Sequence, residues 1–349
     1  MWNLPLPDDD TRTWYIKALG SKTKNKLDKV DSKVQSVYKS VLLPGGKRDV
    51  IDNLLTLLPK DSMNLCTSKM KELMKGLGRG LYKEKDLLDY RTAKSKKEES
   101  RSATEKKIFD KYDDVLTELG KIFNYNGFIS SNADFSYELS KRKQARTCTY
   151  CGREYIYTVE ELSDKDEKKH VARPDFDHWM SHELYPMLAL NYCNLIPCCP
   201  ICNRTIKGTK LMQLGVHVHP YINDKEPQFR FSYKLLDINK PQGEVIIVDD
   251  NDAQEKATIE MFELRALYRY HSETELDDML RIGLKNGRQY VEDYLINIMK
   301  GLNVSVGNAY RSMFGVNLYE DPSEERPLSK FKRDILKELG ILELFETTY

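Results

Sequence analysis

The sequence predicts an α+β fold in which a mostly helical chain is interrupted near its middle by a cysteine-rich segment of short strands. On both sides of the middle, apolar residues recur at steps of three and four, as in helices with one buried face. Between about Arg146 and Tyr233, cysteines, prolines and short strand-like stretches replace that periodicity. We therefore expect a helical N-terminal region (1–140), a central unit (141–235), and a C-terminal part (236–349) with a small strand pair and helices.

The N-terminal region contains two clear helical patterns. A short apolar run from Asp49 to Leu58 is stopped by Pro59. A longer pattern from Glu105 to Phe123 places apolar residues on one face. The charged run 94–101 between them is interpreted as a solvated helix face or a loop.

The C-terminal part begins with strands and then becomes helical. Two strand candidates lie within 234–250, and the better one is 243–248. The remaining expectations are helices: one with a shared face formed by Ile259, Phe262, Ala266 and Tyr270, a long one through 276–298 with a break near Gly283 or Gly287, and a last one over 328–345.

Composition indicates an ordinary globular chain. Its 349 residues are 40% hydrophobic and 31% charged, which is enough to bury a core. The formal net charge of +1 neither supports nor excludes a nucleic-acid partner. No apolar run approaches the roughly 18 residues of a membrane-spanning helix, and the first ten residues do not resemble a secretory leader. We therefore expect a cytoplasmic location.

Four of the seven cysteines form two C-x-x-C pairs, Cys148 with Cys151 and Cys199 with Cys202. Two such pairs can place four thiolates around one Zn²⁺, a closed structural site. The 47 residues between the pairs indicate an inserted hairpin and a charged loop near 160–170. The alternative is four unconnected buried thiols, which is how we interpret the other three cysteines, Cys66, Cys193 and Cys198.

Between and after these pairs lies a set of polar residues: Asp175, Asp177, His178, Asn194, Asn203 and Lys207. Over about sixty residues this pattern resembles the HNH (ββα-metal) endonuclease family, in its zinc-bearing branch. That family has an acidic residue before a histidine, a central asparagine, and an asparagine or histidine on the following helix.

The resemblance implies a role in phosphodiester hydrolysis for each of these residues except Asp175, which either supports the site or is simply solvated. His178 would take a proton from water, since a histidine titrates near neutral pH. Asp177 and Asn203 would supply oxygen ligands to a catalytic Mg²⁺ or Mn²⁺ ion. Asn194 would orient the loop that holds His178, and Lys207 would contact the phosphate.

Two points of spacing bear on these roles. Asp177 and His178 are consecutive, so in a strand they point to opposite faces unless the strand ends or bends there. Asn203 and Lys207 are four apart and share a helix face, but the family usually has two residues between this pair, and here there are three. Arg204 is a second candidate for the phosphate contact.

The other histidines and the basic residues allow two interpretations each. By strand alternation His217 and His219 share one face, either as metal or phosphate contacts or as structural residues. His170 and His182 are interpreted as loop residues. The run Lys141–Arg146 forms, with Arg153, Arg173, Arg204, Lys207 and Lys210, either a rim that contacts phosphates or a solvated charge run.

Partners are expected from the same resemblance. The continuation after residue 220 resembles the HNH subunit of Septu-type antiphage defence systems, which works beside an ATPase. This implies a nucleic-acid substrate, with DNA preferred over RNA, and an N-terminal region that docks a partner or forms a homo-oligomer. The alternative function is a zinc-stabilised module that binds nucleic acid or protein without cleaving.

Overall fold

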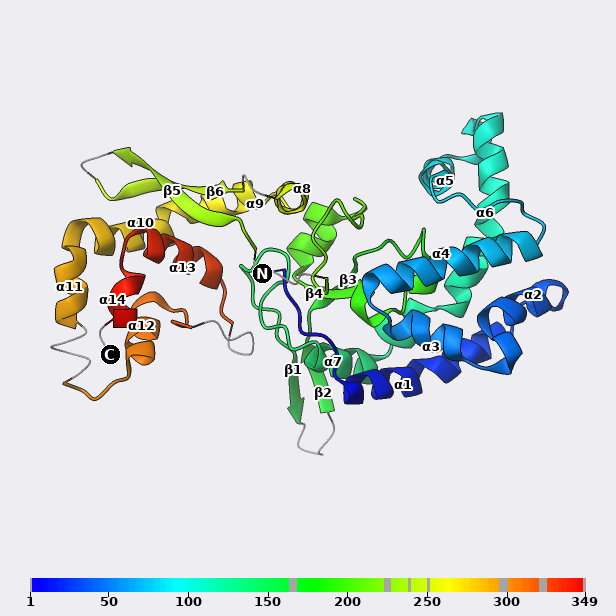
Figure 1. The fold of residues 1–349 in the computed structure, drawn as a ribbon, viewed down its shortest axis with the longest axis horizontal. Coiled ribbons are helices and arrows are strands. Elements are labelled where there is room, and N and C mark those ends of the chain that lie inside the picture. The colour runs from blue at the N-terminus through cyan, green and yellow to red at the C-terminus, as the bar shows by residue number, and fades with distance from the viewer. Residues whose placement is uncertain are drawn as a thin grey trace.

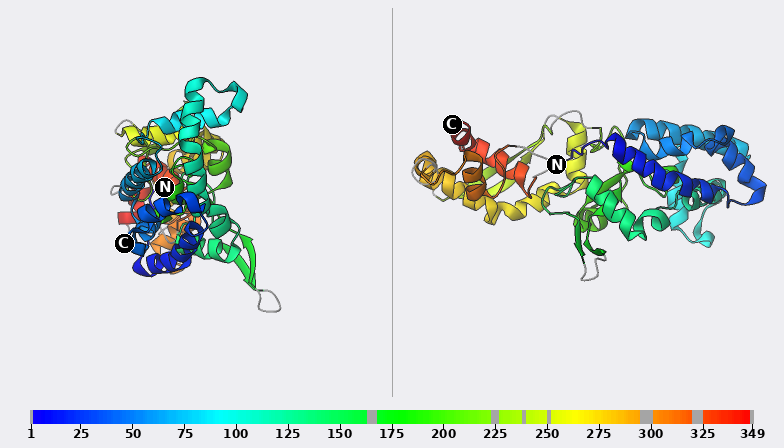
Figure 2. Two further views of the ribbon diagram at one scale, coloured as in Figure 1. Left: turned by 90° about the vertical axis from the view of Figure 1, so that its right-hand side faces the viewer. Right: turned by 90° about the horizontal axis from the view of Figure 1, so that it is seen from below.

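The computed structural model describes residues 2–162, 168–222, 227–237, 240–249, 252–294, 301–319 and 325–347. The molecule is elongated, with the N-terminal helices at one end, the C-terminal helices at the other, and the short strands of the central unit between them (Figure 1). Strands β1 (Val159–Leu162) and β2 (Lys168–Ala172) form a hairpin that projects from the middle of the molecule, as two further views show (Figure 2). The expected charged loop near 160–170 is therefore largely this hairpin, and residues 163–167 lie outside the described part.

The N-terminal region is helical, as the sequence predicts. Asp8 caps the first helix by accepting a hydrogen bond from the backbone N–H of Thr11, and Ser102 and Glu105 form a capping box at the start of the sixth. Its helices are α1 (Asp9–Leu27), α2 (Ser32–Leu42), α3 (Asp49–Thr56), α4 (Pro59–Gly76), α5 (Asp86–Ser95), α6 (Ala103–Ile122) and α7 (Ala133–Arg142), with the short turns η1 (Pro44–Gly46), η2 (Glu98–Ser100) and η3 (Asn126–Ser130).

In the central unit, two short strands and a helical turn carry the polar residues singled out in the sequence. Strand β3 (Asp175–His178) pairs antiparallel with β4 (Leu195–Cys198), with Asp175 opposite Cys198 and His178 opposite Leu195. The connection contains the 3₁₀ turns η4 (Pro186–Leu188) and η5 (Tyr192–Asn194), and the π-helical turn η6 (Ile201–Lys207) follows β4. Small antiparallel sheets within a largely helical chain agree with the predicted α+β class.

The C-terminal part has a strand pair followed by helices, but several predicted helices are shorter than expected. Strand β5 begins at Arg230, so the predicted boundary at 235 falls inside the hairpin. Its elements are β5 (Arg230–Asp237), β6 (Gln242–Val248), α8 (Ala253–Met261), α9 (Leu264–Arg269), η7 (Tyr270–Glu273), α10 (Glu275–Leu280), η8 (Arg281–Asn286), α11 (Gly287–Asp293), α12 (Val306–Phe314), α13 (Ser329–Glu338) and α14 (Leu342–Thr347).

Two of the predicted helices were wrong in extent because the backbone turns within them. Glu263 adopts a positive φ of 51°, which separates α8 from α9, and Tyr270 is 79% exposed instead of sharing the buried face. Gly340, with φ of 68°, separates α13 from α14. The long helix expected over 276–298 runs through α10, η8 and α11, and the π-helical η8 lies at the break predicted near Gly283 or Gly287. Its last positions lie outside the described residues.

The N-terminal region is anchored to the central unit by buried hydrogen bonds. The Tyr15 hydroxyl donates to the Leu190 carbonyl at 2.8 Å. The Asn191 amide donates to the carbonyls of Leu54 and Leu57 at 2.9 and 3.0 Å. These bonds attach α1 and α3 to the segment just before β4. Among the described residues, no helix has the length and apolar content needed to cross a membrane.

Candidate metal centre and active site

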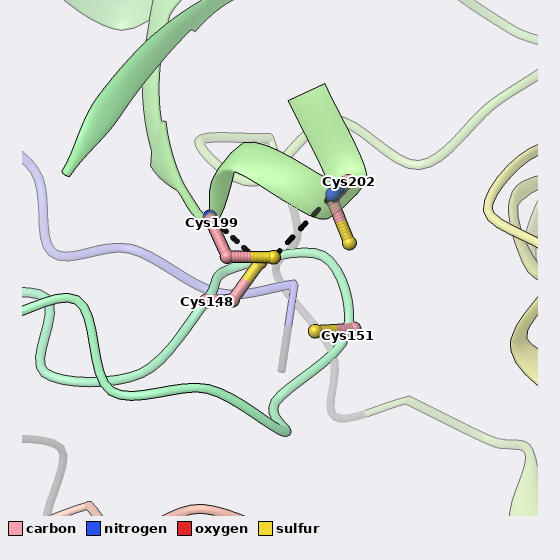
Figure 3. Close-up of side chains that lie close together, drawn as sticks. All are labelled: Cys148, Cys151, Cys199 and Cys202. Atoms are coloured by element: carbon pink, nitrogen blue, oxygen red, sulfur yellow. Dashed lines mark hydrogen bonds between the residues drawn. The ribbon is translucent and has the colours of Figure 1, made fainter. Parts of the chain in front are cut away.

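The four predicted cysteines converge on one point. Their sulfur atoms all lie within 4.8 Å of one another, and all four side chains are buried (Figure 3). Backbone N–H groups donate to these sulfurs, from Cys199 to the Cys148 Sγ at 3.3 Å and from Cys202 to the Cys199 Sγ at 3.4 Å. Thiolates accept such bonds readily, and four of them match the ligand set of a structural zinc site. The residues therefore fit zinc.

The other three cysteines are buried and lie outside this cluster. Burial raises the pKa of Cys66 to about 12 and that of Cys193 to about 11. Both are thus neutral thiols at physiological pH, as the sequence analysis expects. Cys198 lies on the same strand face as Asp175, and burial raises its pKa as well.

The turn that carries the first cysteine pair (residues 148–152) contacts all three parts of the chain. We call this turn the knuckle. Thr149 of the knuckle also donates to the Pro197 carbonyl in β4 at 2.7 Å. Backbone atoms of the knuckle accept hydrogen bonds from the Trp2 indole and amide at 2.9 Å each, from the Tyr268 hydroxyl at 2.7 Å and from the Leu328 amide at 2.8 Å.

His178 is buried and held in one tautomer. Its Nε2 lies 3.0 Å from the Ala189 carbonyl oxygen. A carbonyl only accepts, so Nε2 carries the proton and Nδ1 keeps its lone pair. Burial lowers the pKa of His178 to about 3, so the ring is neutral at pH 7. The rings of Tyr125 and His182 pack against it, with centroids 4.5 and 4.4 Å away.

Asp177 takes part in a closed set of contacts on the other side of β3. Its Oδ2 accepts from the Tyr150 hydroxyl at 2.6 Å, and its Oδ1 accepts from the Lys207 ammonium at 2.7 Å. Lys207 also donates to the His178 carbonyl at 3.2 Å. The side chains of Lys207 and Asp177 are only 7% and 5% exposed, so this is a buried ion pair. Strand β3 continues through His178, and the two residues therefore point apart.

Asn203 contacts Asp175 and not Asp177, with which it was expected to share a metal ion. Its Nδ2 donates to Asp175 Oδ2 at 3.2 Å, while Arg204 forms two bonds of 2.7 Å to the same carboxylate. These bonds lower the pKa of Asp175, against the effect of partial burial. Since Arg204 is itself largely exposed, Asp175 and Arg204 mark the solvent-facing side of the site.

The π-helical form of η6 explains the extra residue between Asn203 and Lys207. A π-helix bonds residue i to residue i+5, which adds one residue to the turn. Gly208 N–H donates to the Asn203 carbonyl at 2.9 Å, which is such a bond. The added residue is thereby absorbed, and Lys207 points inward to Asp177. The phosphate contact proposed for Lys207 is not available in this arrangement.

The Asn194 side chain stabilises the loop after His178 through three hydrogen bonds. Its Oδ1 accepts from the Met180 amide at 2.6 Å, and its Nδ2 donates to the carbonyls of Met180 and Leu188 at 3.0 Å each. The side chain is fully buried. Asn194 thus bonds both ends of the segment from Met180 to Leu188, and Ala189, whose carbonyl fixes His178, follows this segment directly.

The oxygen donors expected for a catalytic divalent ion do not form an open site. Asp177 is filled by Tyr150 and Lys207, and Asn203 is turned to Asp175. Within the described ranges, the cysteine cluster is the group of His, Cys, Asp and Glu side chains that converges closely enough to hold a metal ion. Asp177 and Asn203 in this conformation therefore do not fit a shared Mg²⁺ or Mn²⁺ ion.

Several residues next to the site were not assigned a role from the sequence. Tyr150 lies within the first C-x-x-C pair, and His182 follows His178 by four residues, so both had a positional signal. Tyr125 comes from the N-terminal region, where no motif marks it.

The histidine pair His217 and His219 does not lie on a strand as expected, because residues 211–220 form turns. His217 accepts from the Gln213 amide, and buried His219 has a pKa lowered by burial to about 3. Lys143, expected in a basic rim, is buried between Tyr192 and Tyr221. Both residues therefore lie inside the protein and not on a surface that could contact phosphates in this arrangement.

Comparison of the chain with family models, with curated proteins and with solved structures finds no match.

Proposed function

We propose that this chain is an HNH-type endonuclease that hydrolyses phosphodiester bonds in nucleic acid, with DNA as the substrate ahead of RNA. The observation that carries the proposal is the setting of His178. It is a buried, neutral histidine with Nε2 anchored on a carbonyl and Nδ1 left with a lone pair, at the end of a strand whose partner strand leads into η6. A ring held in this way is suited to remove a proton from water.

The pKa of His178 must rise when the substrate binds if the ring is to act as a base. A pKa of about 3 makes the free ring a weak base. A phosphodiester anion beside the ring favours the protonated form and raises the pKa toward neutrality. Proton transfer from water to Nδ1 would thus be favoured when the phosphate is bound. Arg204 donates twice to Asp175 on the face of β3 opposite the His178 ring, so we assign it no contact with a phosphate beside that ring.

A divalent ion is part of the proposal on chemical grounds alone. Mg²⁺ or Mn²⁺ prefers oxygen ligands and, when bound, would neutralise charge on the phosphate. Because Asp177 is occupied by Lys207, we assign no step to the ion. A defence role beside an ATPase or another partner rests only on the family resemblance, as does self-association through the N-terminal helices.

A second candidate is a zinc-stabilised binding module without cleavage activity. The contacts of Asp177 favour it, because a carboxylate that is buried and paired with a lysine is poorly available to a substrate or an ion. The intact setting of His178 favours cleavage, since a binding module has no need of a free Nδ1.

The decisive experiment is a cleavage and binding assay on the full chain. Plasmid DNA and total RNA are incubated with the wild type, His178→Ala and, as a matched control, His217→Ala, each with Mg²⁺, with Mn²⁺ and without added ion. We expect ion-dependent cleavage that is lost in His178→Ala and kept in His217→Ala. Tight binding without cleavage under all these conditions would establish the binding module instead.

A further inference from the structure

The ion pair between Lys207 and Asp177 is an unusual feature of a site that is proposed to bind a divalent ion. Lys207 places a compact positive charge 2.7 Å from Asp177 Oδ1, inside the protein. From this geometry we infer that the Lys207 ammonium is a built-in cation at Asp177, which Mg²⁺ or Mn²⁺ must displace to bind there. The inference rests on the proposed function in one respect, the identity of the competing ion.

The contacts of both partners show that the position is fully taken. Tyr150 donates to the second carboxylate oxygen, so each oxygen of the buried Asp177 side chain already accepts a hydrogen bond from the protein. Lys207 makes its second bond to the His178 carbonyl at 3.2 Å, which holds the ammonium against β3. A second cation at the same oxygen would be repelled at short range in a region shielded from water. The ammonium and a metal ion are therefore mutually exclusive at Asp177.

The π-helical turn is the device that directs Lys207 inward. Lys207 is the last residue of η6, and Gly208 follows with a positive φ of 48°. The chain then turns, and the next carbonyl, that of Thr209, accepts a hydrogen bond from Arg91 of α5. The N-terminal region thus holds the turn that bears Lys207. Withdrawal of the lysine requires this turn to shift, since the side chain itself is enclosed.

The first test uses the wild-type chain and needs no nucleic acid. Lysines are methylated reductively for short times with and without Mn²⁺, and the modified peptides are quantified by mass spectrometry. Lys207 is expected to react slowly without the ion and at least about tenfold faster with it, because the freed amine becomes accessible. Lys210, half exposed, should react equally in both conditions, and buried Lys143 should stay protected in both.

The second test measures Mn²⁺ affinity by electron paramagnetic resonance in Lys207→Met and in Asp177→Asn/Lys207→Met. The single variant should bind Mn²⁺ at least about tenfold more tightly than the wild type, which corresponds to removing about 1.4 kcal/mol of competition. The double variant should lose that gain. If Lys207→Met does not fold, the labelling of the wild type decides alone.

Two results would overturn the inference: Mn²⁺ that binds while Lys207 stays protected, or a folded Lys207→Met that binds no more tightly than the wild type. Neither outcome depends on cleavage. If the cleavage assay fails while the labelling and Mn²⁺ affinity tests give the expected results, the nuclease proposal is rejected. The inference that Lys207 acts as a cation at Asp177 then still stands.

Discussion

Replacement of Asn194 by aspartate offers a sharp test of the loop clamp, because only the amide nitrogen changes. The retained Oδ1 still accepts the Met180 amide. The new oxygen faces the carbonyls of Met180 and Leu188, which lose the two donors that now bond them at 3.0 Å. The substitution thus exchanges two hydrogen bonds for contacts between like partial charges at a fully buried position.

The expected loss of stability follows from these contacts. The Met180 carbonyl is left without a donor, which costs about 1–3 kcal/mol, whereas the Leu188 carbonyl keeps the Asn191 amide at 3.1 Å and loses one bond of about 0.5–1.5 kcal/mol. Burial without a positive partner also raises the carboxyl pKa above its unfolded value of about 3.9. The stability associated with such a group is fully present below the unfolded pKa and is lost as pH rises through the folded pKa. We therefore expect the lost bonds to destabilise Asn194→Asp by about 1.5–4.5 kcal/mol at pH 7, with a further loss from the ionised carboxylate. The destabilisation should be clearly smaller at pH 4.5, where the protonated carboxyl can donate once.

Urea unfolding at both pH values, followed by circular dichroism, measures this difference. The control is Asn308→Asp at an exposed position of α12. It should change the free energy of unfolding by less than about 0.5 kcal/mol at either pH. If Asn194→Asp lies within about 1 kcal/mol of the wild type at pH 7, or shows the same loss at both pH values, then the clamp does not hold the loop as described.

Three further predictions concern buried groups. Cys148→Ser should lose bound zinc and most of the unfolding free energy, measured by metal analysis and thermal unfolding, whereas Cys66→Ser should keep its zinc. Tyr150→Phe should keep its zinc but lose about 1.5–3 kcal/mol in urea unfolding, because it removes a donor to the Asp177 carboxylate; an unchanged value would show that this bond contributes nothing. Burial lowers the pKa of Lys143 to about 7, so the unfolded chain binds more protons than the folded chain between pH 7 and 10. The free energy of unfolding of the wild type should therefore rise relative to that of Lys143→Met between pH 7 and 9.5. A difference between the two proteins that does not change with pH would contradict a neutral Lys143.

Much of the fold was predictable because its signals are local. The 105–123 helix has a capping box and one apolar face, and both are properties of neighbouring residues. The division of the helix at 253–269 was not predictable, since Glu263 has no special preference for a positive φ. The division at 329–347 has a local signal in Gly340, which the prediction did not use. The hairpin at 159–172 was missed because its strands are mostly exposed and charged, which hides strand periodicity.

The candidate site divides in the same way. The cysteine cluster was predictable from spacing alone. The C-x-x-C spacing is a local property of each pair, and two such pairs in one chain are typical of a metal site. The hydrogen-bond partner of Asn203 could not be predicted. Asp175 and Asp177 lie on the same face of β3, and the sequence does not say which of them η6 approaches. The buried position of Lys207 depends on the π-helical turn, which no pattern in the residues announces.

The knuckle has a consequence for how the chain assembles during synthesis. Trp2 bonds to Tyr150, 148 positions later, and Tyr268 bonds to Cys151 across 117 positions. During synthesis, the first cysteine pair leaves the ribosome well before the second. The N-terminal helices therefore have no complete central unit to pack against until the later segments have been made. Contacts of such long range make folding slow. The supply of zinc at that moment would then set the yield of assembled protein, and shortage would leave folded helices attached to a centre that has not closed.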